Sequence, residues 1–292
     1  MEVHDETAGS NKIAELLRTG VPFAAGKLGT SELDAIWFFL ARRQTSTAYP
    51  YLTHIRRHMC VNAGLWPATD ETVDDWARDV IYNYLPEMDV MAAWNPVAPQ
   101  EERTVLQTIC RDAFICKLRS LEPYYETCSA WTKEIRGKFA VVSPFAGSIG
   151  RQWARRGAVW KSKQLWDESA ICVPVRAGYG PGLSSAAGAW PAGLRDWKDA
   201  VNSVVEQVIK SGARVAIVGC GALSLPICAV LKFAGISAIH MGGATQILFG
   251  IRGRRWETHN VISGFFNDAW VVPSLDEIPS GAAAVEGGCY WV

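Results

Sequence analysis

The chain has 292 residues, of which 49% are hydrophobic, so it contains enough apolar sequence to bury a large core. Its 29 basic residues balance 29 acidic residues, and this neutral total does not indicate a nucleic-acid partner. The polar start MEVHDETAGSNK does not resemble a signal peptide, and no apolar run reaches the roughly 18 residues of a membrane span, which together predict a cytoplasmic protein.

Apolar periodicity changes repeatedly between the helical and the strand pattern along the chain. Asn11 and either Thr30 or Ser31 are expected helix caps, and Gly20 is expected just beyond a helix end. The predicted elements are a helix at 11–18, a strand at 22–25, a helix from about 30 to 43, a helix-rich segment at about 70–125 around one strand at 88–94, a strand at 138–145, a helix at 148–156, a strand at 170–175, a helix at 194–209, a strand at 215–218, a helix at 223–233, a strand at 237–241 and a helical turn at 244–249. This alternation predicts an α/β, Rossmann-like fold with a mostly parallel sheet and helices on both faces. Ligands of such sheets bind beyond the carboxyl ends of the strands.

The eight cysteines are scattered and form neither a CxxC pair nor a cluster with histidine at zinc spacing. Several lie inside apolar runs, as Cys172 does in AICV. We therefore expect free thiols in a reducing compartment and no structural zinc.

The segment RVAIVGCGALSLP predicts a buried strand, a glycine turn and a helix. Gly219 and Gly221 would let the backbone approach a ligand, and the start of the next helix could face an anion. A dinucleotide fits the turn poorly, because Ser224 replaces the third glycine of GxGxxG and the next strand ends in His240 instead of an acidic residue. The same missing acid weakens a methyltransferase interpretation, and a tight turn without any ligand remains an alternative.

The segment HMGGATQILFGIRGRRW combines glycines, arginines and a tryptophan at close quarters. Guanidinium groups match diphosphate oxygens, and an indole ring can stack on a base or a sugar. The plain alternative is a solvated basic loop. The residues proposed to bind a nucleotide or diphosphate here are Gly242, Gly243, Gln246, Arg252, Arg254 and Arg255, with Trp256 as a donor-sugar or base contact.

The segment GKLGTSE follows a predicted strand and opens a helix. Lys27, flanked by Gly26 and Gly29, could bind phosphate, and Glu32 could bind a divalent metal or a sugar hydroxyl. The alternative is ordinary helix capping, because acidic residues are favoured in the first turn of any helix. Ser143 is a further candidate, since it places a hydroxyl where a strand meets its loop.

Taken together, GKLGTSE, VNAGLWP, SPFAGSI, GCGALSLPICAVLKFAGISAIHMGGATQILFGIRGRRW and VEGGCYW resemble the GT-D-type glycosyltransferase family, over most of the chain from about residue 20 onward. The most specific part of the resemblance is GGATQILFGIRGRRW. The resemblance implies a Rossmann-like nucleotide-binding sheet and an Asp-any-Glu motif. It also implies transfer of a hexose from a nucleoside diphosphate sugar, typically a UDP-sugar, often assisted by a divalent cation.

The family's Asp-any-Glu motif falls on Thr30-Ser31-Glu32, so the glutamate is kept and the aspartate is lost. Two outcomes follow. Glu32 retains a weakly bound Mn²⁺ or Mg²⁺ with water and phosphate oxygens, or Lys27 and the arginines neutralise the leaving diphosphate without a metal. We favour the second outcome slightly.

The leading hypothesis is a single α/β glycosyltransferase-like domain over residues 1–292, whose nucleotide-binding half lies at about 138–292. Glu32, backed by Asp34, is the proposed catalytic carboxylate, and Thr30 and Ser143 are proposed donor-sugar or base contacts. The acceptor hydroxyl could belong to a glycan, a protein or a small molecule. A Rossmann-type oxidoreductase or methyltransferase and a noncatalytic nucleotide-binding protein are the alternatives.

Overall fold

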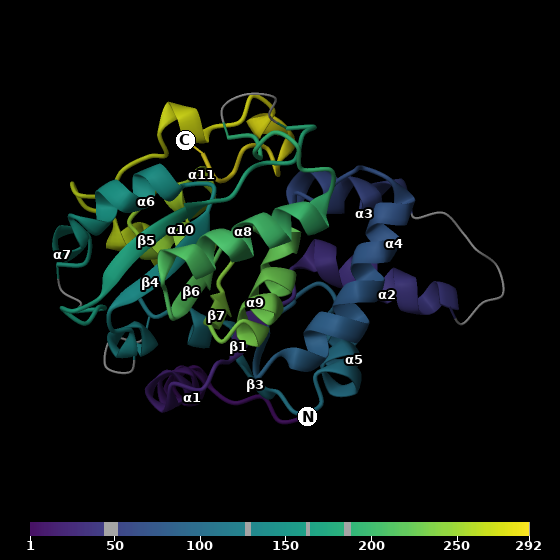
Figure 1. The fold of residues 1–292 in the computed structure, drawn as a ribbon, viewed down its shortest axis with the longest axis horizontal. Helices are drawn as coiled ribbons and strands as arrows, with labels where there is room; N and C mark the ends of the chain where they lie inside the picture. Colours follow the sequence, from purple (N-terminus) through teal and green to yellow (C-terminus); the bar gives the residue numbers. More distant parts are fainter. Residues whose placement is uncertain (44–51, 126–129, 162–163, 184–187, 292) are drawn as a thin grey trace.

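Seven parallel strands form one sheet at the centre of the computed structural model, in the order β3-β2-β1-β7-β6-β4-β5 (Figure 1). The structure describes residues 1–43, 52–125, 130–161, 164–183 and 188–291. Within these, the sheet confirms the predicted α/β, Rossmann-like fold. The strands are β1 (Ala24–Lys27), β2 (Val90–Ala93), β3 (Phe114–Lys117), β4 (Lys138–Ser143), β5 (Ile171–Arg176), β6 (Val215–Val218) and β7 (Ser237–His240).

Helices cover both faces of this sheet, as neighbouring strand residues show. Ala140 and Val142 of β4 face one apolar cluster, and Phe139 and Val141 face the other. The first cluster is covered by α2 (Thr30–Arg43), α3 (Thr53–Arg57), α4 (Asp70–Asp79), α5 (Pro99–Ile109), α8 (Trp197–Ser211) and α9 (Ser224–Phe233). The second is covered by α1 (Glu6–Thr19), α6 (Ala146–Trp153), α7 (Arg156–Val159), α10 (Ala244–Leu248) and α11 (Arg254–Glu257).

Two predictions near the N-terminal half are wrong in detail. Helix α1 begins five residues before the expected cap Asn11, because the Asp5 side chain accepts a hydrogen bond of 2.8 Å from the Ala8 amide. Its predicted end is confirmed, since Gly20 adopts the left-handed conformation at φ 69°. The helix-rich segment contains β3 in addition to β2. This edge strand has only two buried residues, and no glycine or proline beside it marks where it begins or ends.

The chain leaves adjacent central strands towards opposite faces of the sheet. After β1 and β6 it enters α2 and α9 on one face, whereas after β7 and β4 it enters α10 and α6 on the other. Loops that diverge in this way leave a crevice beyond the carboxyl ends of the strands, which is where open parallel sheets bind ligands. The topology therefore places the crevice at β1, β7, β6 and β4.

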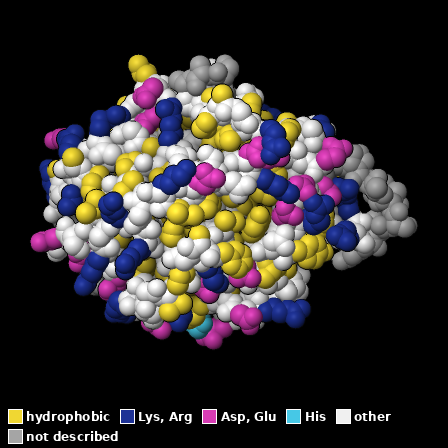
Figure 2. All heavy atoms as spheres, in the orientation of Figure 1, with side chains coloured by type: hydrophobic (Ala, Val, Ile, Leu, Met, Phe, Trp, Pro, Cys, Tyr) yellow, Lys and Arg dark blue, Asp and Glu magenta, His cyan; other side chains and the backbone are white. Residues whose placement is uncertain are grey.

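The surface mixes charges of both signs, as the neutral composition predicts. Figure 2 shows basic and acidic side chains interspersed on one face, and Lys198 for example lies 2.6 Å from Asp75 and 2.9 Å from Asp79. Among the described residues, no helix is both long and apolar enough to cross a membrane. The seven cysteines in the described part of the chain are unpaired, as expected, and Cys128 lies outside it.

Candidate functional site

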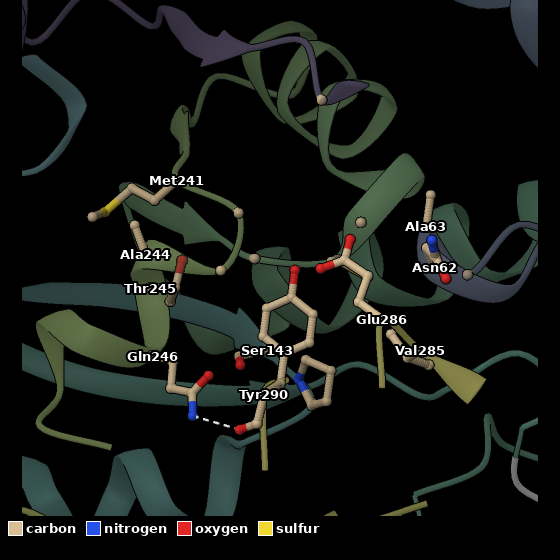
Figure 3. A pocket seen from close by; sticks show the side chains of 18 of the residues that line it. Asn62, Ala63, Ser143, Met241, Ala244, Thr245, Gln246, Val285, Glu286 and Tyr290 are labelled. Carbon is tan, nitrogen blue, oxygen red and sulfur yellow. Dashed lines mark hydrogen bonds between the residues drawn. The ribbon is translucent and has the colours of Figure 1, made fainter. Parts of the chain in front are cut away.

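A cavity of about 360 Å³ occupies the crevice at the carboxyl ends of β1, β7, β6 and β4. Figure 3 shows side chains from separate parts of the chain around it, among them Asn62, Ser143, Thr245 and Tyr290. Twelve of the predicted site residues line it: Lys27, Gly29, Thr30, Glu32, Ser143, Gly219, Gly221, Gly242, Gly243, Gln246, Arg255 and Trp256. Four do not: Gly26, Asp34, Arg252 and Arg254.

Gly26 and Asp34 have other surroundings. A side chain at Gly26 would meet the His240 Cβ at 3.1 Å and the Leu225 Cδ2 at 3.2 Å, so this glycine allows β1 to pack closely. Asp34 is half-buried, and burial raises its pKa while the nearby His58 and His54 lower it. The structure thus places the proposed backup carboxylate away from the cavity.

Lys27 and Glu32 form the charged end of the cavity. Burial lowers the pKa of Lys27, and the carboxylates of Glu32 and Glu122 oppose that shift. Burial raises the pKa of Glu32, which is only 8% exposed, and the Lys27 ammonium opposes that shift. A side chain at Gly29 would collide with the Glu32 carboxylate, so glycine here lets the carboxylate fold back over its own helix start.

Sequence reasoning missed Glu122, which also lines the cavity. Burial raises the pKa of this carboxyl to about 7, against the lowering effects of Arg119, a hydrogen bond with Tyr124, and Lys27. Glu122 follows the short helix after β3, so only recognition of that strand would have placed it at the same edge of the sheet. Trp94 also lines the cavity and was missed, although it ends the predicted strand at 88–94. Its ring centroid lies 5.0 Å from the Lys27 Nζ, and its indole N–H donates to the Leu28 carbonyl at 2.6 Å.

The three arginines of the GIRGRRW segment have different partners. Arg252 forms a two-pronged ion pair with Glu257, with nitrogen to oxygen distances of 2.8 to 3.0 Å. Arg254 donates to the carbonyl of Gly287. Arg255 donates from Nη1 to the Tyr290 hydroxyl at 2.9 Å and lies at the cavity. Arg252 and Arg254, two of the three proposed diphosphate ligands, therefore bind other groups of the protein. Of the three, only Arg255 faces the cavity.

Gln246 connects this arginine segment to the C-terminal tail. Its amide nitrogen donates to the carbonyls of Arg252 and Tyr290, at 2.8 and 2.9 Å, and Figure 3 shows the second bond. Trp256 is 8% exposed and packs edge-on against Tyr290 at 6.0 Å between ring centroids. The tail is thus docked at the cavity, and it contributes Val285, Glu286, Tyr290 and Trp291 to the wall.

The turn after β6 lines the cavity, but two of its backbone amides already have partners inside the protein. The Cys220 amide donates to the Ser224 hydroxyl at 2.9 Å, and the Ala222 amide donates to the Ala63 carbonyl at 2.8 Å. Gly221 has φ +52°, and a side chain there would collide with the same Ala63 carbonyl. Ser224, in the position of the missing third glycine, therefore closes the turn.

His240 ends the neighbouring strand β7 and is neutral. Burial, followed by the charge of Lys27, lowers its pKa to about 3. Its Nδ1 accepts from the Gly242 amide at 3.2 Å, which helps to hold the GG turn in place. The Ser143 hydroxyl at the end of β4 likewise accepts from the Phe145 amide at 3.1 Å.

Aromatic rings form much of the remaining wall. Trp190 stacks on Trp66 at 5.4 Å between ring centroids, and Tyr179 packs against Trp291 at 5.7 Å. Trp190 and Tyr179 line the cavity and were not predicted, because they lie in a turn-rich stretch without a recognisable motif. Flat apolar surfaces of this kind suit stacking on a base or on a sugar ring.

Few protein ligands for a divalent cation gather near Glu32 in the described part of the chain. Mg²⁺ and Mn²⁺ are held by several oxygen ligands. In the described ranges, no three His, Cys, Asp or Glu side chains gather in a way that could hold a metal ion. Thr30 offers a neutral hydroxyl beside Glu32, and the Lys27 ammonium opposes the rise in the pKa of Glu32 that burial causes. This arrangement suits an anion better than a cation.

Comparisons with known proteins found little that resembles the chain. No family model and no curated protein matches it. A solved structure described as the selenomethionine-substituted structure of domain of unknown function 1792 aligns with a TM-score of 0.43 and 12% identity, over 84% of this chain and 79% of that chain. A likeness this distant does not assign a function, which rests on the geometry of the cavity itself.

Proposed function

We propose that the protein is a glycosyltransferase that moves a hexose from a nucleoside diphosphate sugar, typically a UDP-sugar, to an acceptor hydroxyl. The observation that carries the proposal is the meeting of two cations, Lys27 and Arg255, with the buried carboxylate of Glu32 in one cavity at the carboxyl edge of a parallel sheet. The cavity volume of about 360 Å³ is in the range of small-molecule sites. The resemblance of the cavity-lining segments to GT-D-type enzymes supports the same assignment.

The diphosphate of the donor would lie between Lys27 and Arg255. A lysine acts as a point charge for phosphate, and an arginine offers several N–H donors in a fixed fork. Arg255 uses Nη1 for Tyr290, Glu286 and a long contact with the Cys289 sulfur, and its remaining N–H groups make no hydrogen bond within the described residues. The two cations would stabilise the charge that develops on the leaving diphosphate.

Glu32 would act as the general base. The acceptor oxygen forms a bond to the anomeric carbon of the donor, the bond from that carbon to the diphosphate oxygen breaks, and the acceptor proton passes to the Glu32 carboxylate. Burial beside Lys27 suits this role, because a carboxyl with a raised pKa holds a proton better than an exposed one. Thr30 and Ser143 would contact the donor sugar or the base, and Trp256 would provide an apolar surface beside them.

We propose that transfer does not depend on a divalent cation. Lys27 and Arg255 would supply the positive charge that a metal supplies elsewhere, and the described residues contain no group of three His, Cys, Asp or Glu side chains that could hold a metal ion.

A panel of ligands tests the proposal. Thermal shift and calorimetry with UDP, GDP and their sugars, each with EDTA or with Mn²⁺, should show diphosphate-dependent binding that EDTA does not abolish. Release of the sugar from a bound donor should follow. Binding of a nicotinamide cofactor or S-adenosylmethionine alone would favour the oxidoreductase or methyltransferase alternative. Good binding of UDP without any transfer or hydrolysis would favour a noncatalytic protein.

A further inference from the structure

Glu286 in the C-terminal tail has a strained backbone. Its φ is +47°, and it is the one non-glycine residue with positive φ in the described part of the chain. Gly287 and Gly288 follow with φ of 68° and 78°. Residues other than glycine rarely adopt a positive φ, because their Cβ atom then comes too close to the backbone. Such backbone strain is found at ligand sites more often than elsewhere. The strained conformation of Glu286 therefore suggests that this residue has a role in ligand binding.

The tight turn directs the Glu286 carboxylate into the cavity. Figure 3 shows this carboxylate and the Tyr290 hydroxyl pointing into the same space. Both groups are bound to one nitrogen, since Arg255 Nη1 lies 3.5 Å from Glu286 Oε2 and 2.9 Å from the Tyr290 hydroxyl. The Cys289 thiol also donates to Glu286 Oε2, at 3.2 Å.

The Arg255 pair differs from the neighbouring Arg252 pair. Arg252 and Glu257 make three contacts of 2.8 to 3.0 Å outside the cavity. Arg255 and Glu286 make one contact of 3.5 Å, and their side chains are 41% and 42% exposed. A single long contact between half-exposed groups is weak and can exchange. The Arg255 guanidinium is therefore held by a carboxylate that a better anion could replace.

A second carboxylate makes the position of Glu286 unfavourable. Glu32 lines the same cavity, and the charge of Glu286 contributes to the raised pKa of Glu32. Two carboxylates in one cavity repel each other, and an arriving diphosphate adds further negative charge. Displacing Glu286 from the cavity would remove this repulsion and would also free Arg255 from its contact with Glu286.

We propose that the Glu286 carboxylate occupies Arg255 in the free protein and that a phosphate group of the ligand displaces it. The inference rests on the proposed function, because it assigns the displacing anion to the diphosphate of the donor. Glu286 then competes with a phosphate group for Nη1 of Arg255. Ligands without a phosphate are unaffected by this competition, so Glu286 lowers the affinity of the cavity for diphosphates alone.

The test compares Glu286→Gln with Glu257→Gln by titration calorimetry. Both variants lose one carboxylate paired to an arginine, and only the first carboxylate lies in the cavity. The probes are UDP, inorganic pyrophosphate and uridine. Because an internal competitor lowers apparent affinity by the fraction of time it occupies the site, Glu286→Gln should bind UDP and pyrophosphate about fivefold more tightly than the unaltered protein. Uridine affinity should not change, and Glu257→Gln should match the unaltered protein with all three probes.

The outcomes separate the inference from the function on which it rests. Weaker or unchanged diphosphate binding by Glu286→Gln, with good UDP binding by the unaltered protein, would overturn the displacement and leave the proposed function intact. An equal gain for uridine would also overturn it, since the change would then have opened the cavity in general. If neither the unaltered protein nor the variant binds UDP or pyrophosphate, both proposals fail together.

Discussion

Two glycine-containing turns at the same edge of the sheet differ in what they leave available to a ligand. In the turn after β6, the amides of Cys220 and Ala222 are bound to Ser224 and Ala63. In the turn after β1, the buried charges of Lys27 and Glu32 shift each other's pKa and face the cavity. A glycine pattern shows that the backbone can approach a ligand, but a binding site also needs polar groups without internal partners.

The largest expected effect comes from removing the cation at the β1 turn. Lys27→Met should lower the rate of sugar transfer roughly 10²- to 10³-fold, because the leaving diphosphate loses an electrostatic contact in a partly buried site. Steady-state kinetics with a UDP-sugar would measure the loss, and the variant should remain folded because it no longer buries an ammonium group.

Lys232→Met provides the matched control. Lys232 lies 2.9 Å from an Asp89 carboxylate oxygen and donates to the Glu87 carbonyl at 2.7 Å, away from the cavity lining. The Lys232→Met variant should be less stable than the unaltered protein but should transfer sugar at the same rate. Equal rates for Lys27→Met and the unaltered protein would remove Lys27 from the proposed mechanism.

A smaller effect is expected from Glu122, through stability and pH. Its pKa is about 7 in the folded protein against 4.5 for the ordinary carboxyl, so the folded state keeps a proton that the unfolded state releases. The stability that this proton provides is complete below about pH 4.5 and is lost as pH rises through about 7. Glu122→Gln has no carboxyl group to titrate, so its stability does not fall in this way as pH rises. Between pH 5 and pH 8 it should therefore gain about 2 kcal/mol in unfolding free energy relative to the unaltered protein.

Urea denaturation at several pH values would measure the difference. Parallel stability curves for Glu122→Gln and the unaltered protein would show that the carboxyl titrates normally and does not share the low-dielectric end of the cavity with Lys27.

The smallest expected effect probes the closed turn. Ser224→Ala removes the acceptor of the buried Cys220 amide and should cost about 1 to 2 kcal/mol of stability. UDP affinity should stay unchanged, because the amide was not available to the ligand. A loss of UDP affinity without a loss of stability would mean that the β6 turn binds the phosphate, which contradicts the comparison between the two turns.

Most of the fold follows from the sequence, because its central strands are apolar runs bounded by glycine and its helices have clear periodicity. Strand β6 matches its predicted bounds. The short edge strand β3 was not recognised, and with it the position of Glu122 was lost. Local pattern determines this edge strand weakly, since only two of its residues are buried and no glycine separates it from its neighbours.

The site was less predictable, because partners depend on tertiary structure. Arg252 and Arg255 are the same residue type and lie three residues apart, yet Arg252 pairs with Glu257 whereas Arg255 lines the cavity. Trp190 reaches the cavity from a distant segment without a motif, and the VEGGCYW segment does not by itself show that Glu286 is one of its residues that face the cavity. Chain topology brings these groups together, and a single sequence does not show which charges meet.

The most direct test of the account is a calorimetric titration of UDP, in EDTA, into the unaltered protein, Arg255→Gln and Arg252→Gln. A lost hydrogen bond to a charged group should weaken UDP binding by Arg255→Gln roughly tenfold to hundredfold. Arg252→Gln should bind UDP as the unaltered protein does and lose only stability. Undiminished binding by Arg255→Gln, or an equal loss in both variants, would contradict the proposal that Lys27 and Arg255 hold the diphosphate.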